Sequence, residues 1–150
     1  MSWQGTLFLK VEAFVEGVFA VYEIDTLVCG SDSIITNLNT SHALFNVTHR
    51  KELLTDSNLT FSDVQSLFSV QSGSLSLNTC PITSILIYSD ALATVEVASD
   101  QGIAVYDSNE VTVDVQGHSF DPERTFYMKV SSFQTSIVEP LTVWIIDCSD

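Results

Sequence analysis

Basic residues are scarce in this chain. Five Lys and Arg stand against nineteen Asp and Glu, which gives a formal net charge of −14 at pH 7. Nucleic-acid binding requires clustered Lys and Arg that displace counterions from phosphates. The only adjacent basic pair is Arg50-Lys51. We therefore expect no nucleic-acid partner.

Charged residues as a whole make up 16% of the chain, below the quarter or so that is typical of globular proteins. This shortage predicts that part of the surface is covered by other protein, so we expect an oligomer, with a homotrimer favoured. The alternative is a monomer whose surface is made polar by Ser and Thr.

Cysteine is also rare, with Cys29, Cys80 and Cys148 and no Cys-x-x-Cys pair. An odd number without paired spacing argues against a disulfide framework and against a structural zinc site. The sequence therefore predicts buried free thiols.

Long apolar runs are missing, since no segment approaches the roughly 18–20 residues that cross a membrane. The first residues lack a basic segment followed by an apolar one, because Lys10 interrupts the apolar stretch. We expect no membrane partner, no signal peptide and synthesis in a host cytoplasm. Without a secretion signal, the Asn-x-Ser/Thr sequons at Asn39, Asn46 and Asn58 are interpreted as chance matches.

Catalytic patterns are sparse too. His42, His49 and His118 do not have the spacing of zinc ligands, and Ser119 and Asp121 follow His118 within a segment of turn-forming residues. The six glycines are isolated, so no phosphate-binding loop is indicated. We expect no enzymatic activity, no catalytic residues, no cofactor and no resident metal.

What the chain does contain is a series of short β-rich runs separated by turn residues. Their spacing is close to the roughly 8–12 residues per strand of β-sandwiches. The runs cover residues 83–88, 93–98, 102–106, 110–115, 125–130 and 141–146. They predict a mainly all-β fold, an antiparallel β-sandwich of jelly-roll or Ig-like topology, and residues 1–150 suit one domain.

The first 80 residues are less regular. Residues 6–15 and 18–24 favour two strands, although apolar residues also recur there at helical spacing. Residues 30–80 are polar and mixed, so we expect an insertion that interrupts the β pattern and carries what is specific to this protein. Within it, 62–70 predicts one short helix with a capping box, and 48–54 a further helical turn.

Two sets of side chains are candidates for function. Asp107, Asn109 and Glu110 offer oxygen ligands of the kind that Ca²⁺ takes, although solvated carboxylates are the preferred interpretation. Large aromatic residues are interpreted as core or interface, and the flat rings of strand residues as an alternative sugar platform. The aromatic set is Trp3, Phe8, Phe14, Phe68 and Trp144, of which Trp144 is expected to anchor the last strand in the core.

The segments at 87–97, 103–106, 110–115 and 121–130 together resemble the small β-sandwich domains on the surfaces of tailed-phage virions, in head decoration (cement) and fibre-associated proteins. The resemblance covers about the last 65 residues. It implies a non-enzymatic virion structural protein, often a trimer, that stabilises an assembled shell by contacts with the major capsid protein or another virion protein. The alternative is a carbohydrate- or receptor-binding module of a tail fibre or cell surface.

Overall fold

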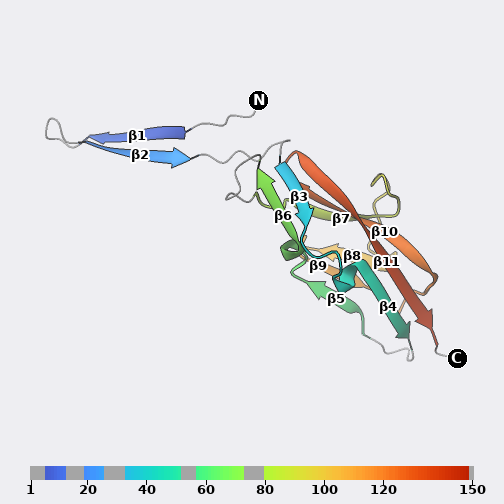
Figure 1. Cartoon of the computed structure of the whole chain (residues 1–150). Coiled ribbons are helices and arrows are strands. Elements are labelled where there is room, and N and C mark those ends of the chain that lie inside the picture. Colours follow the sequence, from blue (N-terminus) through green and yellow to red (C-terminus); the bar gives the residue numbers. More distant parts are fainter. Residues whose placement is uncertain (1–5, 13–18, 26–32, 52–56, 73–79, 149–150) are drawn as a thin grey trace.

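The computed structural model describes residues 6–12, 19–25, 33–51, 57–72 and 80–148, and they are mainly β (Figure 1). The all-β, sandwich-like fold expected from the sequence is confirmed. The largest sheet has four strands in the order β4 (Asn46–Lys51), β11 (Thr135–Asp147), β10 (Phe120–Ser132) and β7 (Ser84–Tyr88). All neighbours in this sheet are antiparallel except β4, which runs parallel to β11.

The remaining described strands form smaller sheets. A three-stranded sheet has the order β5 (Leu59–Ser62), β9 (Glu110–Val113) and β8 (Ile103–Tyr106). Two antiparallel pairs join β3 (Ser33–Asn37) to β6 (Phe68–Ser72), and β1 (Thr6–Glu12) to β2 (Phe19–Asp25). The described helices, η1 (Ala43–Phe45) and η2 (Val64–Leu67), are short 3₁₀ turns, and neither is long and apolar enough to cross a membrane.

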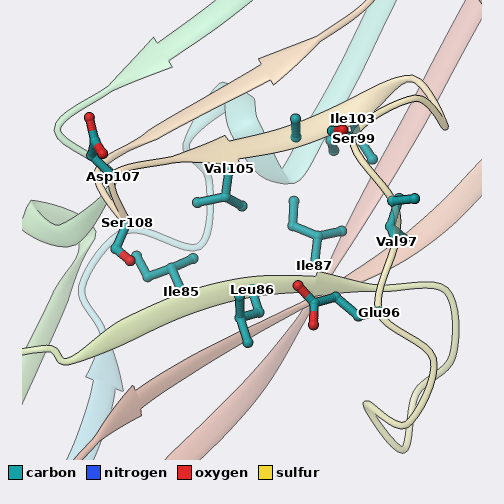
Figure 2. A pocket seen from close by; sticks show the side chains of 12 residues that line it. Ile85, Leu86, Ile87, Glu96, Val97, Ser99, Ile103, Val105, Asp107 and Ser108 are labelled. Atoms are coloured by element: carbon teal, nitrogen blue, oxygen red, sulfur yellow. The ribbon is translucent and has the colours of Figure 1, made fainter.

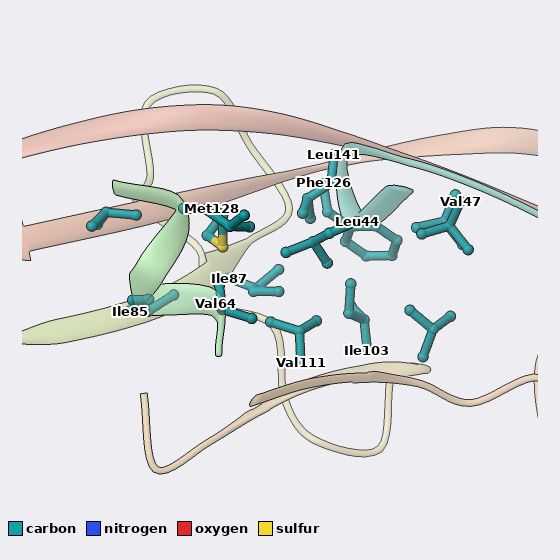
Figure 3. Packing of buried hydrophobic residues seen from close by; sticks show 14 of the residues in the cluster. Leu44, Val47, Val64, Ile85, Ile87, Ile103, Val111, Phe126, Met128 and Leu141 are labelled. Carbon is teal, nitrogen blue, oxygen red and sulfur yellow. The ribbon is translucent and has the colours of Figure 1, made fainter. Parts of the chain in front are cut away.

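The core lies between the four-stranded and three-stranded sheets (Figure 3). Successive side chains of a strand point to opposite faces of its sheet, and every second residue in the central part of β10 and β11 is buried. These six residues are Phe126, Met128, Val130, Leu141, Val143 and Ile145. Val111 and Val113 of β9 and Ile103 of β8 meet them from the opposite sheet, while Leu44 of η1 and Val64 of η2 fill the space between.

Lys51, at the end of β4, is buried among these elements with only 5% of its surface exposed. Its Nζ donates a hydrogen bond to the carbonyl of Gln116 at 2.7 Å and pairs with the Asp147 carboxylate at 3.6 Å. A buried ammonium group requires such partners because it has lost its water. Lys51 thereby joins β4 to the end of β11 and to the turn after β9.

The expectations for the first 80 residues are partly confirmed. The two N-terminal strands form an antiparallel hairpin, as predicted. The insertion predicted for residues 30–80 is wrong, since the described part of this segment supplies β3, β4, β5 and β6. Its polar residues belong to strands with one exposed side, such as β4, where Val47 is buried and Thr48 is exposed. A polar stretch of that kind does not interrupt a sheet.

Two predicted helices and one predicted strand also differ. The 62–70 helix is limited to η2 and gives way to β6; its N-cap residue, Asp63, has a left-handed φ of 57° and makes no side-chain capping bond. The turn expected at 48–54 lies in β4 as far as residue 51. The strand expected at 93–98 is a loop with one isolated bridge, between Glu96 and Tyr88.

The prediction that Trp144 anchors the core is wrong. Its neighbours Val143 and Ile145 are fully buried, whereas Trp144 is 39% exposed. The cause is the period of two along a strand, because two flanking residues that face the core leave the one between them on the opposite face. The alternative assignment of Trp144 to an interface stays a prediction.

The cysteines also differ from expectation. Cys80 is buried and disulfide-bonded, which overturns the prediction of free thiols for this residue. Cys148 is a free, exposed thiol, and Cys29 lies outside the described residues.

Exchange of Phe126 for Ala should destabilise the protein far more than exchange of Trp144 for Ala. Phe126 is fully buried and packs edge-to-face on Phe120 with ring centroids 5.6 Å apart, so its truncation should cost about 3–5 kcal/mol. Trp144→Ala should cost less than about 2 kcal/mol, because part of the ring is already in water. Urea unfolding of both variants measures this, and equal losses would show that Trp144 is buried in solution.

Candidate functional site: a groove between two sheet edges

A groove of about 370 Å³ lies between β7 and β8, which are the outermost strands on one side of their respective sheets (Figure 2). We call it the β7–β8 groove. In Figure 2 the side chains of Ile85 and Ile87 rise from β7 toward Val105, which descends from β8. The apolar lining also includes Val97 and Ile103, and the rim carries Glu96, Ser99, Asp107 and Ser108.

Both strands turn main-chain groups toward this groove. The carbonyl of Ile87 accepts a hydrogen bond from the Val97 amide at 2.8 Å, on the side away from β10. Since main-chain groups alternate in direction along a strand, those of Ile85 point to the same side. On β8 the carbonyls of Gly102 and Tyr106 bond toward β9, and Ala104 has the same direction by alternation, so Ile103 and Val105 direct their main-chain groups to the other side, toward the groove. Sheet edges with such groups accept an extended peptide.

The loop after β7 closes one end of the groove, and Asp90 organises it. The Asp90 carboxylate accepts hydrogen bonds from the Val95 amide at 2.7 Å, from the Leu92 amide at 3.0 Å, and from both the amide and the hydroxyl of Thr94. The bond from Val95, followed by those from Thr94 and Leu92, holds the pKa of Asp90 below its ordinary value. The ionised carboxylate therefore fixes the loop that carries Val97 to the β7 edge.

The turn between β8 and β9 borders the other end and contains the three residues considered as calcium ligands. Asp107 and Ser108 both have positive φ, 49° and 54°, as in the tight turns of hairpins. The Asn109 side chain is engaged, because its Nδ2 donates to Asp63 at 3.4 Å and its Oδ1 accepts from the Gln65 amide at 3.2 Å. Within the described ranges no three His, Cys, Asp or Glu side chains gather closely enough to hold a metal ion. The structure thus gives the calcium interpretation of Asp107, Asn109 and Glu110 no support.

His118 contacts residues of its own turn and of β10. His118 Nδ1 lies 3.2 Å from Asp114 Oδ2, and its ring stacks on Phe120. The Gly117 amide, with help from His118, holds the pKa of Asp114 below its usual range. Ser119 Oγ donates to the carbonyl of Ile145 at 3.1 Å, so the segment 117–121 is built of local and strand contacts.

A second surface is the outer face of the four-stranded sheet. Trp144 and Val138 are exposed there, and Tyr127 is half-buried. Trp144 stands in register with Thr48 of the edge strand β4. A flat ring in this position offers a stacking surface to a sugar or an anchor to a protein.

Of the other aromatic residues expected in a core or interface, the structure describes the side chain of one. Phe68 is buried in the core, at 6% exposure. Trp3, Phe14 and the side chain of Phe8 lie outside the described residues. The groove itself was not foreseen, although Ile85 and Ile87 alternate in one predicted strand and Ile103 and Val105 in another.

No protein-family model, curated protein or solved structure matches this chain. The likeness to virion surface domains stays an expectation drawn from the sequence.

The Asp90 loop should loosen in acid. Because the folded pKa of Asp90 is lowered, its contribution to loop order is fully present above the ordinary value of about 3.9 and is lost as the pH falls through the folded value. The amide proton shifts of Thr94 and Val95 should therefore move only at the acid end of an NMR titration. Asp90→Asn should shift them at neutral pH, whereas Asp100→Asn, at an exposed acid nearby, should not; unchanged shifts in Asp90→Asn would contradict this role.

Proposed function

We propose that this chain is a non-enzymatic assembly subunit that binds an extended segment of another protein chain in the β7–β8 groove. The observation that carries the proposal is the apolar groove between the outer edges of β7 and β8, lined by Ile85, Ile87, Ile103 and Val105. Residues 95–97 already bond to the end of the β7 edge, so the incoming strand would use the part of β7 before Ile87. An incoming strand gains main-chain hydrogen bonds from such an edge and places alternate side chains on the apolar lining.

The occupant that we propose is the β1–β2 hairpin of a second copy. Within the described residues β1 and β2 pair only with each other, and Figure 1 shows the hairpin standing away from the packed sheets. Leu9, Val11 and Val21 are each about half exposed, and a two-stranded hairpin is marginally stable by itself in water. Leu9 and Val11 share one face of the hairpin, and Val21 lies on the other face opposite Lys10. Docking of the first face on another copy would remove Leu9 and Val11 from water.

The structural role implied by the virion resemblance agrees with an assembly subunit, because both act through protein contacts. We place the assembly outside the cytoplasm, since Cys80 is disulfide-bonded and disulfides persist mainly in oxidising compartments and on particle or cell surfaces. A trimer remains the favoured size.

A second candidate function is sugar binding on the outer face of the four-stranded sheet. Trp144, 39% exposed in a strand whose neighbouring residues are buried, favours it. A glycan array with Trp144→Ala as the negative control tests this candidate without touching the groove.

Self-association should be visible by light scattering at micromolar concentration as a multiple of 16.5 kDa. Leu9→Asp and Val11→Asp place charge on exposed hairpin positions and should return the monomer mass without lowering the melting temperature. Val105→Lys should also return it, because Lys on an edge strand discourages strand addition.

The matched control is Val138→Lys, on the outer face at 37% exposure, which should leave the oligomer intact. Val105 is half-buried, so thermal melting must first show that the Val105→Lys variant is folded. A wild-type protein that stays monomeric throughout, or dissociation by Val138→Lys alone, would refute the proposed contact.

A further inference from the structure

The structure places the sequon asparagines on the surface. Asn46 and Thr48 are exposed, as are Asn58 and Thr60. The third, Asn39, is likewise exposed in the loop after β3. The asparagine and the hydroxyl residue of each sequon are thus open to solvent together, while the residue between them is buried in β4 and half-buried in β5.

The hydrogen bonds described at Asn46 and Asn58 do not use the side-chain Nδ2, the atom to which an N-linked sugar is attached. At Asn58 the side-chain Oδ1 accepts a bond from the Val115 amide at 3.3 Å. Oδ1 remains an acceptor when a sugar is attached to Nδ2, so glycosylation preserves this contact. At Asn46 the backbone N–H closes the η1 turn by bonding to the Ala43 carbonyl, a contact that does not involve the side chain.

An independent observation points to the compartment in which sequons are used. Cys80 is buried and disulfide-bonded. Disulfides form in the lumen of the secretory pathway and are rare in the cytosol, and N-glycosylation belongs to secreted proteins. The sequence alone favours chance matches because it shows no secretion signal, whereas this disulfide favours an oxidising compartment.

Asn46 and Asn58 lie on one side of the sandwich. β4, which begins with Asn46, and β5, which directly follows Asn58, are the outer strands on one side of the four-stranded and three-stranded sheets. β7 and β8 are the outer strands on the other side. No Asn-x-Ser/Thr occurs after Asn58, so glycans would cover the first pair of edges and leave the second pair open.

The register adds a contact for the Asn46 sugar. Val47 and Val143 are in register and buried, so Asn46 and Thr48 share the opposite face with Thr142 and Trp144. Trp144 is directly beside Thr48 and diagonal to Asn46. Its exposed ring is within reach of a sugar on Asn46, and aromatic faces stack on apolar sugar faces.

We propose that Asn46 and Asn58 are N-glycan acceptors, and that the glycan on Asn46 covers Trp144. In the reaction, Nδ2 of the asparagine attacks C1 of a lipid-pyrophosphate-linked oligosaccharide. The N–C1 bond forms, the bond from C1 to the pyrophosphate oxygen breaks, and the Nδ2 proton and the lipid pyrophosphate leave. This goes beyond the assembly role and does not depend on the β7–β8 groove.

The first experiment measures occupancy. The full chain is secreted from eukaryotic cells behind a cleavable secretion signal, and peptide N-glycosidase in ¹⁸O-water converts each glycosylated Asn to labelled Asp. Peptide mass spectrometry should find the label at Asn46 and Asn58, with loss of the Asn46 label in Thr48→Ala. Recovery of Asn46 or Asn58 without any label from the secreted, disulfide-bonded protein would overturn the proposal.

The second experiment tests the contact with Trp144. In a Trp3→Phe background Trp144 is the only tryptophan, so acrylamide quenching reports on its accessibility. Asn46→Gln or Thr48→Ala should raise the quenching constant and shift the emission to the red, while Asn58→Gln, at the edge of the other sheet, should change neither. Equal quenching with and without the Asn46 glycan would overturn the coverage of Trp144, whatever the oligomeric state of the protein.

Discussion

β10 and β11 are antiparallel partners along most of their thirteen-residue lengths, and both turn alternate side chains into the same core. β4 joins the outer side of β11, β7 joins the outer side of β10, and the three-stranded sheet packs on the apolar face that they share. A shift of this pair by one residue would exchange Val143 and Ile145 with Trp144 and expose the core. The positions of β4 and β7 at the edges of this sheet, and the exposure of Val138 and Trp144 on its outer face, follow from this one register.

The sequence predicted those parts of the fold whose signal is local. The alternation in residues 125–130 and 141–146 lies in β10 and β11, and the first two strands form their predicted hairpin. The predictions failed where the outcome depends on a distant partner. The residue types at 48–51, which include the basic pair, favour a helical turn. These residues form a strand instead, because β11 lies beside them. Lys51 is buried there because the Gln116 carbonyl and the Asp147 carboxylate contact its ammonium group.

The candidate site was less predictable than the fold for the same reason. Ile85, Ile87, Ile103 and Val105 each have the pattern of strand residues, but alternation does not reveal which strands end a sheet. Trp144 illustrates a second failure of sequence-based prediction. Its apolar neighbours suggested that the ring is buried, but because side chains alternate along a strand, Trp144 faces away from the core. Cys80 was misjudged because an odd count of cysteines does not exclude one disulfide.

The hairpin and the groove are different surfaces of one chain, and this has a consequence for symmetry. A contact between the hairpin of one copy and the groove of the next is heterologous, so an open row of copies has one unused groove at one end and one unused hairpin at the other. If each contact rotates the chain by a third of a turn without translation, three copies close into a ring with no free surface. A quarter or a fifth of a turn without translation likewise closes a ring of four or five copies, whereas a contact that also advances along the axis leaves the row open and builds a filament.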